Sequence, residues 1–382
     1  MKLRLIIVIT LCLTLVACGS ARKRGPDPTP LSKITASAQL ASLWRSNFAS
    51  GGTGAGSQFI NLLPIIVDDQ IFGASAQGRV AAIGKSDGKL RWSTDLENQI
   101  TAGVGVGDGV VAVVSAAREL VTLRSDSGEL RWKESIDQTS FTPPLVYRGI
   151  VVMQTIDGDL LAIDASSGEL MWDAFYDQPE FVVFGSPRPL AIGNLVLVGN
   201  ATGRVFATDL ATGLEFWQIY LGGTSSETAL NDAETIPVIF GDHLFVSDYT
   251  NAVVAYDLTD GSLFWQRLRK SQRRLAVDSD QVYGTDLDDT VFALSRSDGS
   301  VRWEQKSLLY RKLSNIALVG DHLVVGDNQG YLHILDTDSG EIIGRAKLRS
   351  DVLFGGFLTD GNRLFVSYRQ GSMEAFRLTA VQ

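Results

Sequence analysis

Short apolar runs with polar residues at alternate positions recur along most of the chain. Between Pro143 and Trp172 four such runs occupy residues 145–147, 150–154, 160–164 and 170–172, and the turn sequences Arg-Gly, Asp-Gly and Ser-Ser-Gly separate them. Alternation with a period of two residues is typical of half-buried β-strands, and glycine-containing turns typically connect antiparallel neighbours. The pattern therefore predicts units of four short antiparallel strands, without sustained helical periodicity in the repeats.

Each unit ends on a tryptophan strand that follows a glycine turn. The recurring tryptophans are Trp44, Trp92, Trp132, Trp172, Trp217, Trp265 and Trp303, and the recurring glycines are Gly88, Gly128, Gly168, Gly213, Gly261, Gly299 and Gly340. Forty residues after Trp303, Ile343 stands where the next tryptophan is expected. The glycine predicts a hairpin turn with positive φ, which glycine adopts without steric strain. We interpret the tryptophans as packing between neighbouring units, with ligand binding as the alternative.

The number of units follows from the start of the third strand in each. This strand begins near Gly78, Glu119, Gly158, Gly203, Asn251, Thr290, Gly330 and Gly371, which makes eight units. The last unit stops before its tryptophan strand, whereas Leu40–Trp44 is a tryptophan strand with no unit before it. The two fragments complete one another. The predicted fold is therefore all-β: an eight-bladed β-propeller of four-stranded antiparallel blades over residues 39–382, whose last blade is closed by the N-terminal strand.

The N-terminus has the pattern of an export signal. A positively charged start precedes the apolar stretch Leu5–Val16, which is shorter than the roughly 20 apolar residues that a spanning helix needs. The stretch ends in Leu-Val-Ala-Cys, which resembles a bacterial lipobox. We therefore predict a lipoprotein signal peptide over residues 1–17, lipidation of Cys18 and a flexible tether over residues 18–38. The alternative is an ordinary signal peptide with an incidental cysteine.

Composition and charge exclude several classes of function. The formal net charge is −9 and becomes −11 when the signal peptide leaves, so non-specific nucleic-acid binding is not expected. The mature chain keeps only Cys18, which lipidation blocks, so no disulfide or cysteine metal site is expected. His243 and His322 hold one repeat position two blades apart and should diverge by about 90° around an eight-bladed ring. We predict no catalytic, metal or cofactor site.

Two long connections are the candidate binding site. From Trp132 to Pro143 there are 11 residues, but from Trp172 to Pro189 there are 17, and from Trp217 to Pro237 there are 20. Equivalent connections lie on one face of a propeller, so these two should form one patch. The first contains Phe175, Tyr176, Phe181, Val183 and Phe184, and the second contains Glu227, Asp232 and Glu234. An apolar centre beside acidic residues suits a protein interface, unless residues 181–184 simply belong to a strand edge.

A basic run, Arg267–Arg274, lies on the next connection. Such a run can meet acidic partners or lipopolysaccharide phosphates. The alternative is a solvated loop.

The repeat resembles that of a known family. The stretch AIDASSGELMW, Ala162–Trp172, is similar to the quinoprotein-type propeller repeat that quinone-dependent dehydrogenases share with the BamB family of outer-membrane assembly lipoproteins. The lipobox, the eight units and the stretch Leu308–Asp336 resemble the BamB family, and the adjacent cysteine pair of the dehydrogenases is missing.

The resemblance implies a function and a location. It implies a non-catalytic scaffold of the outer-membrane β-barrel assembly machinery, anchored by lipid to the outer membrane and facing the periplasm. Implied partners are the periplasmic POTRA domains of BamA, other components of the machinery and unfolded outer-membrane proteins. The implied contact residues are Phe181, Val183, Phe184, Asp232 and Glu234, although Phe184 stands where the family has arginine. The alternatives are a quinone- or ligand-binding periplasmic propeller and a scaffold of another envelope complex.

Overall fold

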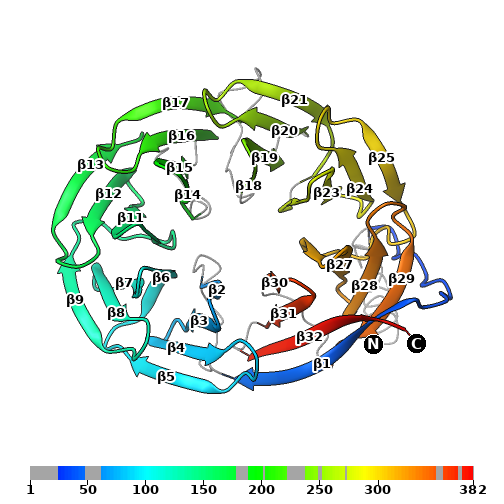
Figure 1. Ribbon diagram of the computed structural model, residues 1–382, viewed down its shortest axis with the longest axis horizontal. Helices are drawn as coiled ribbons and strands as arrows, with labels where there is room; N and C mark the ends of the chain where they lie inside the picture. Colours follow the sequence, from blue (N-terminus) through cyan, green and yellow to red (C-terminus); the bar gives the residue numbers. More distant parts are fainter. Residues whose placement is uncertain are drawn as a thin grey trace, which may run out of the picture.

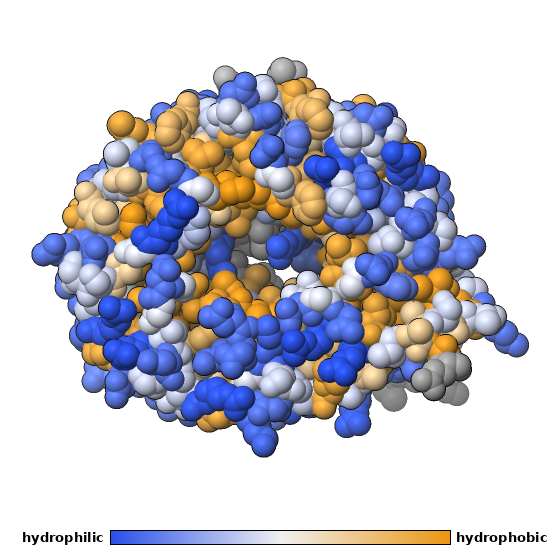
Figure 2. Space-filling view, in the orientation of Figure 1, coloured by the Kyte–Doolittle hydropathy of each residue, from blue (hydrophilic) through white to orange (hydrophobic). Residues whose placement is uncertain are grey.

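The computed structural model describes residues 25–47, 62–177, 188–200, 203–221, 237–247, 252–271, 273–349, 356–368 and 372–381. Within these residues, 32 strands form eight four-stranded antiparallel sheets. The sheets stand as blades around a central opening, with the first strand of each blade innermost and the last at the rim (Figures 1 and 2). The predicted eight-bladed propeller is confirmed.

Seven blades take four consecutive strands each. Blade one contains β2 (Ile65–Val67), β3 (Gln70–Ala74), β4 (Arg79–Gly84) and β5 (Leu90–Asp95). Blade two contains β6 (Ile100–Gly107), β7 (Val110–Ser115), β8 (Glu119–Arg124) and β9 (Leu130–Ser135). Blade three contains β10 (Leu145–Tyr147), β11 (Ile150–Gln154), β12 (Asp159–Asp164) and β13 (Leu170–Phe175). Blade four contains β14 (Leu190–Ile192), β15 (Leu195–Gly199), β16 (Arg204–Asp209) and β17 (Glu215–Tyr220).

The second half of the ring follows the same plan. Blade five contains β18 (Val238–Phe240), β19 (His243–Ser247), β20 (Ala252–Asp257) and β21 (Leu263–Leu268). Blade six contains β22 (Ala276–Val277), β23 (Gln281–Thr285), β24 (Val291–Ser295) and β25 (Val301–Gln305). Blade seven contains β26 (Ile316–Val319), β27 (His322–Gly326), β28 (Tyr331–Asp336) and β29 (Ile342–Lys347).

Blade eight joins the two ends of the chain. It contains β30 (Phe357–Asp360), β31 (Arg363–Ser367), β32 (Ser372–Ala380) and, as its outer strand, β1 (Ala38–Asn47). β1 pairs with β32 along its whole length, from Ala38 opposite Ala380 to Asn47 opposite Ser372. The predicted closure by the N-terminal strand is confirmed. It ties the ring together through a ladder of backbone hydrogen bonds that is interrupted by one register shift, between Ser42 and Trp44.

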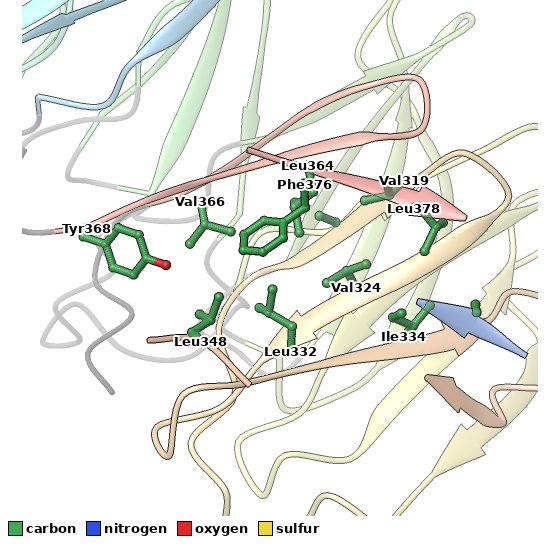
Figure 3. Close-up of a cluster of buried hydrophobic side chains, with 12 residues drawn as sticks. Val319, Val324, Leu332, Ile334, Leu348, Leu364, Val366, Tyr368, Phe376 and Leu378 are labelled. Atoms are coloured by element: carbon green, nitrogen blue, oxygen red, sulfur yellow. The ribbon is translucent and has the colours of Figure 1, made fainter. Parts of the chain in front are cut away.

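The hydrophobic core lies between the blades. The middle strands are apolar on both faces, as in β7, where every residue is buried, because a neighbouring blade covers each face. Between blades seven and eight, Val324 and Leu332 meet Leu364 and Phe376 (Figure 3). Full burial of one such side chain contributes about 1.5–3 kcal/mol. One blade cannot bury its own faces, so the repeats are stable only as a ring.

Seven tryptophans join consecutive blades. The Trp217 indole of blade four packs on Gly261, in the hairpin turn of blade five, and its Nε1–H donates to the carbonyl oxygen of Leu258 at 3.1 Å. The other six indoles repeat this hydrogen bond, and all seven distances lie between 2.7 and 3.3 Å. The hairpin glycines all have φ between 65° and 83°. The predictions that the tryptophans pack between blades and that the hairpin glycines have positive φ are both confirmed; the packing of the indoles on these glycines was not predicted.

The eighth tryptophan position differs from the prediction. Ile334 pairs with Gly344 as Ala293 pairs with Trp303, so Gly344, not Ile343, holds the position. A Cβ atom on Gly344 would clash with the carbonyl oxygen of Ala38 at the start of β1. In blade eight the two outer strands come from opposite ends of the chain, so they have no connecting hairpin on which an indole could pack. The beginning of β1 takes its place.

The segment before β1 lies along blade seven. The Thr29 amide donates to the carbonyl oxygen of Leu309 at 3.0 Å, and the Ser37 amide donates to that of Ile343 at 2.9 Å. Leu31 packs against the cluster between blades six and seven. Figure 1 shows this segment, in blue, outside β29. The described part of the predicted tether is therefore attached to the ring, whereas residues 1–24, with Cys18, lie outside the described residues.

The tryptophan–glycine contact gives a stability prediction. Gly261 and Gly149 have nearly the same φ, 72° and 75°. A Cβ on Gly261 would lie 2.8 Å from the Trp217 ring, whereas a Cβ on Gly149 would meet nothing within 4 Å. We expect Gly149→Ala to cost about 1 kcal/mol in backbone strain. Gly261→Ala should cost about 1–3 kcal/mol more, because Trp217 must move.

Urea unfolding followed by tryptophan fluorescence measures both variants. Equal midpoints for Gly261→Ala and Gly149→Ala would show that the indole is not packed on this turn.

Candidate functional site

The two long connections start and end on one face of the ring. The first connection leads from β13, the rim strand of blade three, to β14, the innermost strand of blade four. The second leads from β17, the rim strand of blade four, to β18, the innermost strand of blade five. We call this face, on which the connections 176–189, 221–237, 269–275 and 306–315 start and end, the crossover face. The predicted contact residues Phe181, Val183, Phe184, Asp232 and Glu234 lie outside the described residues, which include the ends of both connections. Because blades three, four and five are consecutive, these ends are neighbours.

Tyr176 does not belong to an exposed apolar patch. Its ring stacks on Phe206 of blade four with 4.0 Å between centroids, and its hydroxyl is 2.7 Å from Oγ1 of Thr208. Burial raises the pKa of Tyr176. The residue therefore anchors the start of the first connection between two blades, whereas Phe175 beside it is 65% exposed.

Arg188 anchors the other end of the first connection. Its Nη2 donates to the carbonyl oxygen of Val104, in β6, at 2.6 Å. Since β6 belongs to blade two and Arg188 leads into blade four, the side chain reaches past blade three. Burial, with a smaller effect of the positive charge of Arg274, lowers the pKa of Arg188 to about 10. The sequence analysis missed this contact, although a lone arginine between two prolines at positions 187 and 189 was a visible signal.

The basic run is largely engaged within the chain. Arg269 pairs with Asp286 at 2.6 Å, and Arg273 lies 3.6 Å from Asp289. Arg267 donates from Nε to the carbonyl oxygen of Gly299 at 2.7 Å. The interpretation as a solvated loop is therefore wrong for these three arginines. Lys270 and Arg274 are exposed and present their charge on the crossover face.

A buried polar cluster in blade seven was not predicted. Arg311, on the connection before β26, donates from Nε to Oδ2 of Asp327 at 2.8 Å. Nε2 of His333 lies 3.1 Å from the same oxygen, and Nδ1 of His333 accepts from Nε of Arg345 at 3.2 Å. The Nδ1 contact assigns the ring proton to Nε2, so the imidazole is neutral and donates to Asp327. The cluster also holds the N-terminal segment, because Nη1 of Arg311 donates to the carbonyl oxygen of Thr29 at 2.9 Å.

The cluster is structural. Burial alone would raise the pKa of Asp327, but hydrogen bonds from His333, the Tyr331 amide and Arg311, with the Arg311 charge, hold it at about 2. Burial lowers the pKa of His333, against the effect of its bond to Asp327. Arg311, Asp327 and His333 are at most 2% exposed. A substrate has no access to groups so sealed from solvent.

The other histidines occupy the expected turn positions. His243 opens β19 in blade five and His322 opens β27 in blade seven. The His243 ring packs 4.1 Å from that of Phe264, between centroids. Within the described residues, no group of three or more His, Cys, Asp and Glu side chains is placed to hold a metal ion. Nor does that part of the chain contain a helix long and apolar enough to cross a membrane.

The His333 environment predicts a dependence of stability on pH. The pKa of His333 in the folded chain lies below its ordinary value of 6.5. As the pH falls below about 6.5, His333 therefore takes up a proton more readily in the unfolded chain than in the folded one, and protonation favours unfolding. Stability should therefore decrease from pH 7 to pH 5, with His333 contributing at most about 1.4 kcal/mol per pH unit. The Asp327 contribution persists until the pH approaches 2–4.

Urea midpoints at pH 5, 6 and 7 test this expectation. His333→Gln should show a smaller loss of stability on acidification than the natural chain, and His322→Gln, at a half-buried turn, should keep the original slope. A His333→Gln slope equal to that of the natural chain would exclude His333 as the titrating group.

Comparisons with known proteins agree on one family. A sequence profile described as "Outer membrane protein assembly factor BamB" matches residues 36–102 and 76–305. A protein of that name from Legionella pneumophila is 37% identical over 382 residues, covering 98% of both chains. Another, from Pseudomonas aeruginosa, is 36% identical over 374 residues, covering 97% of this chain and 98% of its own.

Solved structures give the same result. The crystal structure of BamB from Moraxella catarrhalis superposes with a TM-score of 0.74 at 27% identity, over 89% of this chain and all of that one. A quinohemoprotein alcohol dehydrogenase from Comamonas testosteroni superposes with a TM-score of 0.67 over 88% of this chain and 76% of its own, but at 14% identity. That likeness shows the propeller fold alone. From the full-length identities and the family profile, the chain belongs to the BamB family of outer membrane protein assembly factors.

Proposed function

We propose that this chain is a non-catalytic scaffold lipoprotein of the outer-membrane β-barrel assembly machinery. It binds the periplasmic POTRA domains of BamA through the two long connections of the crossover face, and so assists insertion of outer-membrane proteins. The observation that carries the proposal is the placement of both connections, between blades three and four and between blades four and five, on one face of a closed ring.

Both described ends of the first connection are anchored to the ring. Tyr176 is packed between blades at one end, and Arg188 holds β6 at the other. Ends that are fixed in this way lose little conformational freedom when a partner binds, so more of the contact energy remains as affinity. Phe181, Val183 and Phe184 would supply the apolar centre of the interface, and Asp232 and Glu234 would supply charge complementarity towards basic residues of the partner.

The N-terminal segment supports a membrane-anchored arrangement. With Cys18 lipidated, 10 residues would lie between Cys18 and Thr29, which is held on the crossover face of blade seven. A chain of that length spans at most about 40 Å. The propeller would then hang close below the inner leaflet of the outer membrane, on the periplasmic side. The tether would leave the ring at blade seven, three blades away from blade four.

Calorimetric titration of the chain from Gly19 onward with the tandem POTRA domains of BamA tests the partner and the site. We expect the natural chain to bind. The double variant Asp232→Lys with Glu234→Lys should bind at least tenfold more weakly, a loss of about 1.4 kcal/mol or more, because two attractive charges become repulsive.

The matched control is Glu129→Lys with Glu169→Lys. It makes the same change of charge at exposed hairpins on the opposite face, and its affinity should stay within twofold of the natural chain. Unchanged binding by the Asp232/Glu234 variant would move the interface elsewhere. Absence of binding by the natural chain would contradict BamA as the direct partner.

A further inference from the structure

The outer strands of the blades differ at the residue that precedes the recurring tryptophan. In blades one, two and six this residue is an arginine: Arg91, Arg131 and Arg302. In the three consecutive blades three, four and five it is Met171, Phe216 and Phe264, with 47%, 60% and 45% of the side chain exposed. Large apolar side chains therefore replace charged ones at equivalent positions on one arc of the rim.

A second position changes in the same three blades. Three residues after the tryptophan, blades one, two and six carry Asp95, Ser135 and Lys306, whereas blades three, four and five carry Phe175, Tyr220 and Leu268. These three are 65%, 48% and 78% exposed. Blades seven and eight are polar here, with Lys347 and Asn47.

We call the six apolar residues of blades three to five the rim patch. Figure 2 shows hydrophobic residues among hydrophilic ones along the left and upper rim, where Figure 1 places β13, β17 and β21, and a mainly hydrophilic rim near β5. Exposed apolar residues that gather on one arc of a soluble protein are typical of interaction sites.

The rim patch lies on the outermost strands of three sheets. β13, β17 and β21 each pair on one side only, with β12, β16 and β20. In the part of the chain that the structure describes, no strand pairs with their other sides. An edge strand presents backbone N–H and C=O groups to a further strand. The patch therefore combines apolar side chains with an edge that can form backbone hydrogen bonds.

Blade seven shows what covers such an edge. Its residue before the tryptophan position is apolar, Ile343, and it is half-buried rather than exposed. Its side chain packs against the cluster between blades seven and eight. The chain's own N-terminal segment lies along its backbone, with the Ser37 amide donating to the carbonyl oxygen of Ile343 at 2.9 Å. Leu31 of the same segment and Ile342 both pack against the cluster between blades six and seven. The outer strand of blade seven is thus matched, within this molecule, by a polypeptide segment that lies along the rim and forms a backbone hydrogen bond to it. Blade eight carries Leu43 before its tryptophan, at 38% exposed, but lacks an apolar residue at the second position.

We propose that the rim patch is a docking surface for an extended polypeptide segment with apolar side chains. Such a segment would satisfy both properties of the edge, because its backbone can pair with the strand while alternate side chains cover the apolar residues. A lipid surface or the side of a folded protein would satisfy only the second. Identification of the segment as part of an unfolded outer-membrane protein rests on the proposed function, but the docking surface does not.

The patch adjoins the crossover face. Phe175, Tyr220 and Leu268 are the last strand residues before the connections 176–189, 221–237 and 269–275. A segment on the rim and a partner on the crossover face would therefore be neighbours, on different residues.

Fluorescence anisotropy of a synthetic peptide tests the proposal on the full mature chain. The probe is a labelled 12-residue peptide of alternating valine and threonine, with one lysine and one aspartate at its ends so that its net charge is zero. The variant is Met171→Arg with Phe216→Arg and Phe264→Arg, which introduces the residue that blades one, two and six already carry at this position. We expect binding by the natural chain and at least tenfold weaker binding by the variant.

The matched control is Leu90→Arg with Leu130→Arg and Val301→Arg. It adds the same charge in blades one, two and six at apolar residues that are 55%, 56% and 46% exposed, and it should bind the peptide within twofold of the natural chain. Equal weakening by control and variant, or no weakening by the variant, would overturn the proposal. Absence of peptide binding by the natural chain would overturn it too.

Two further titrations, with lipid vesicles and with POTRA domains, distinguish a membrane or a folded partner from a peptide segment on the rim patch. The vesicles contain phosphatidylethanolamine and phosphatidylglycerol. If they bind the natural chain but not the variant, and the peptide binds neither protein, the patch is a membrane-binding surface and the proposal is overturned. POTRA domains should bind the variant as they bind the natural chain. If the natural chain binds the peptide and not the POTRA domains, the proposed function fails and the rim patch stands.

Discussion

The ring depends on an indole packed against a glycine turn. Each of seven contacts uses one side chain for three purposes: its ring fills the space above the turn, its N–H satisfies a carbonyl oxygen of the next blade, and its size requires that the turn residue lack a Cβ. Positive φ at that glycine shapes the hairpin that receives the ring. One pair of residues therefore sets the hairpin and the position of the neighbouring blade together, and repetition of the pair builds the ring.

The closing blade explains the features that depart from the repeat. Where the two chain ends meet, blade eight has no hairpin, so blade seven has Gly344 in place of a tryptophan and the start of β1 packs against it. The same region carries the N-terminal segment and the Arg311–Asp327–His333 cluster that holds it. The same region of the ring, blades seven and eight, thus both closes the ring and holds the N-terminal segment that leads towards Cys18, the predicted lipidation site. Blade seven lies three blades from blade four, which carries the ends of both long connections.

Local periodicity made the fold predictable, and long-range contacts limited the rest. Tryptophan and glycine four residues apart identify a hairpin and its strand wherever they occur, so the blades and their number followed from sequence. The assignment of Ile343 failed by one residue because a count of forty assumed a constant repeat length. Arg188 contacts a residue 84 positions away and Arg311 one 282 positions away. No periodicity relates such pairs, and the burial of Tyr176 between blades depends in the same way on packing that the sequence does not display.

The proposed contact between BamA and the crossover face of blades three to five is most directly tested by photo-crosslinking in living cells. A photoreactive phenylalanine analogue at Phe184 should give a crosslink to BamA. The same analogue at Ser127, on a hairpin of the opposite face, should give none. Crosslinks to BamA from Ser127 and not from Phe184 would show that the opposite face meets the partner, and would contradict this arrangement.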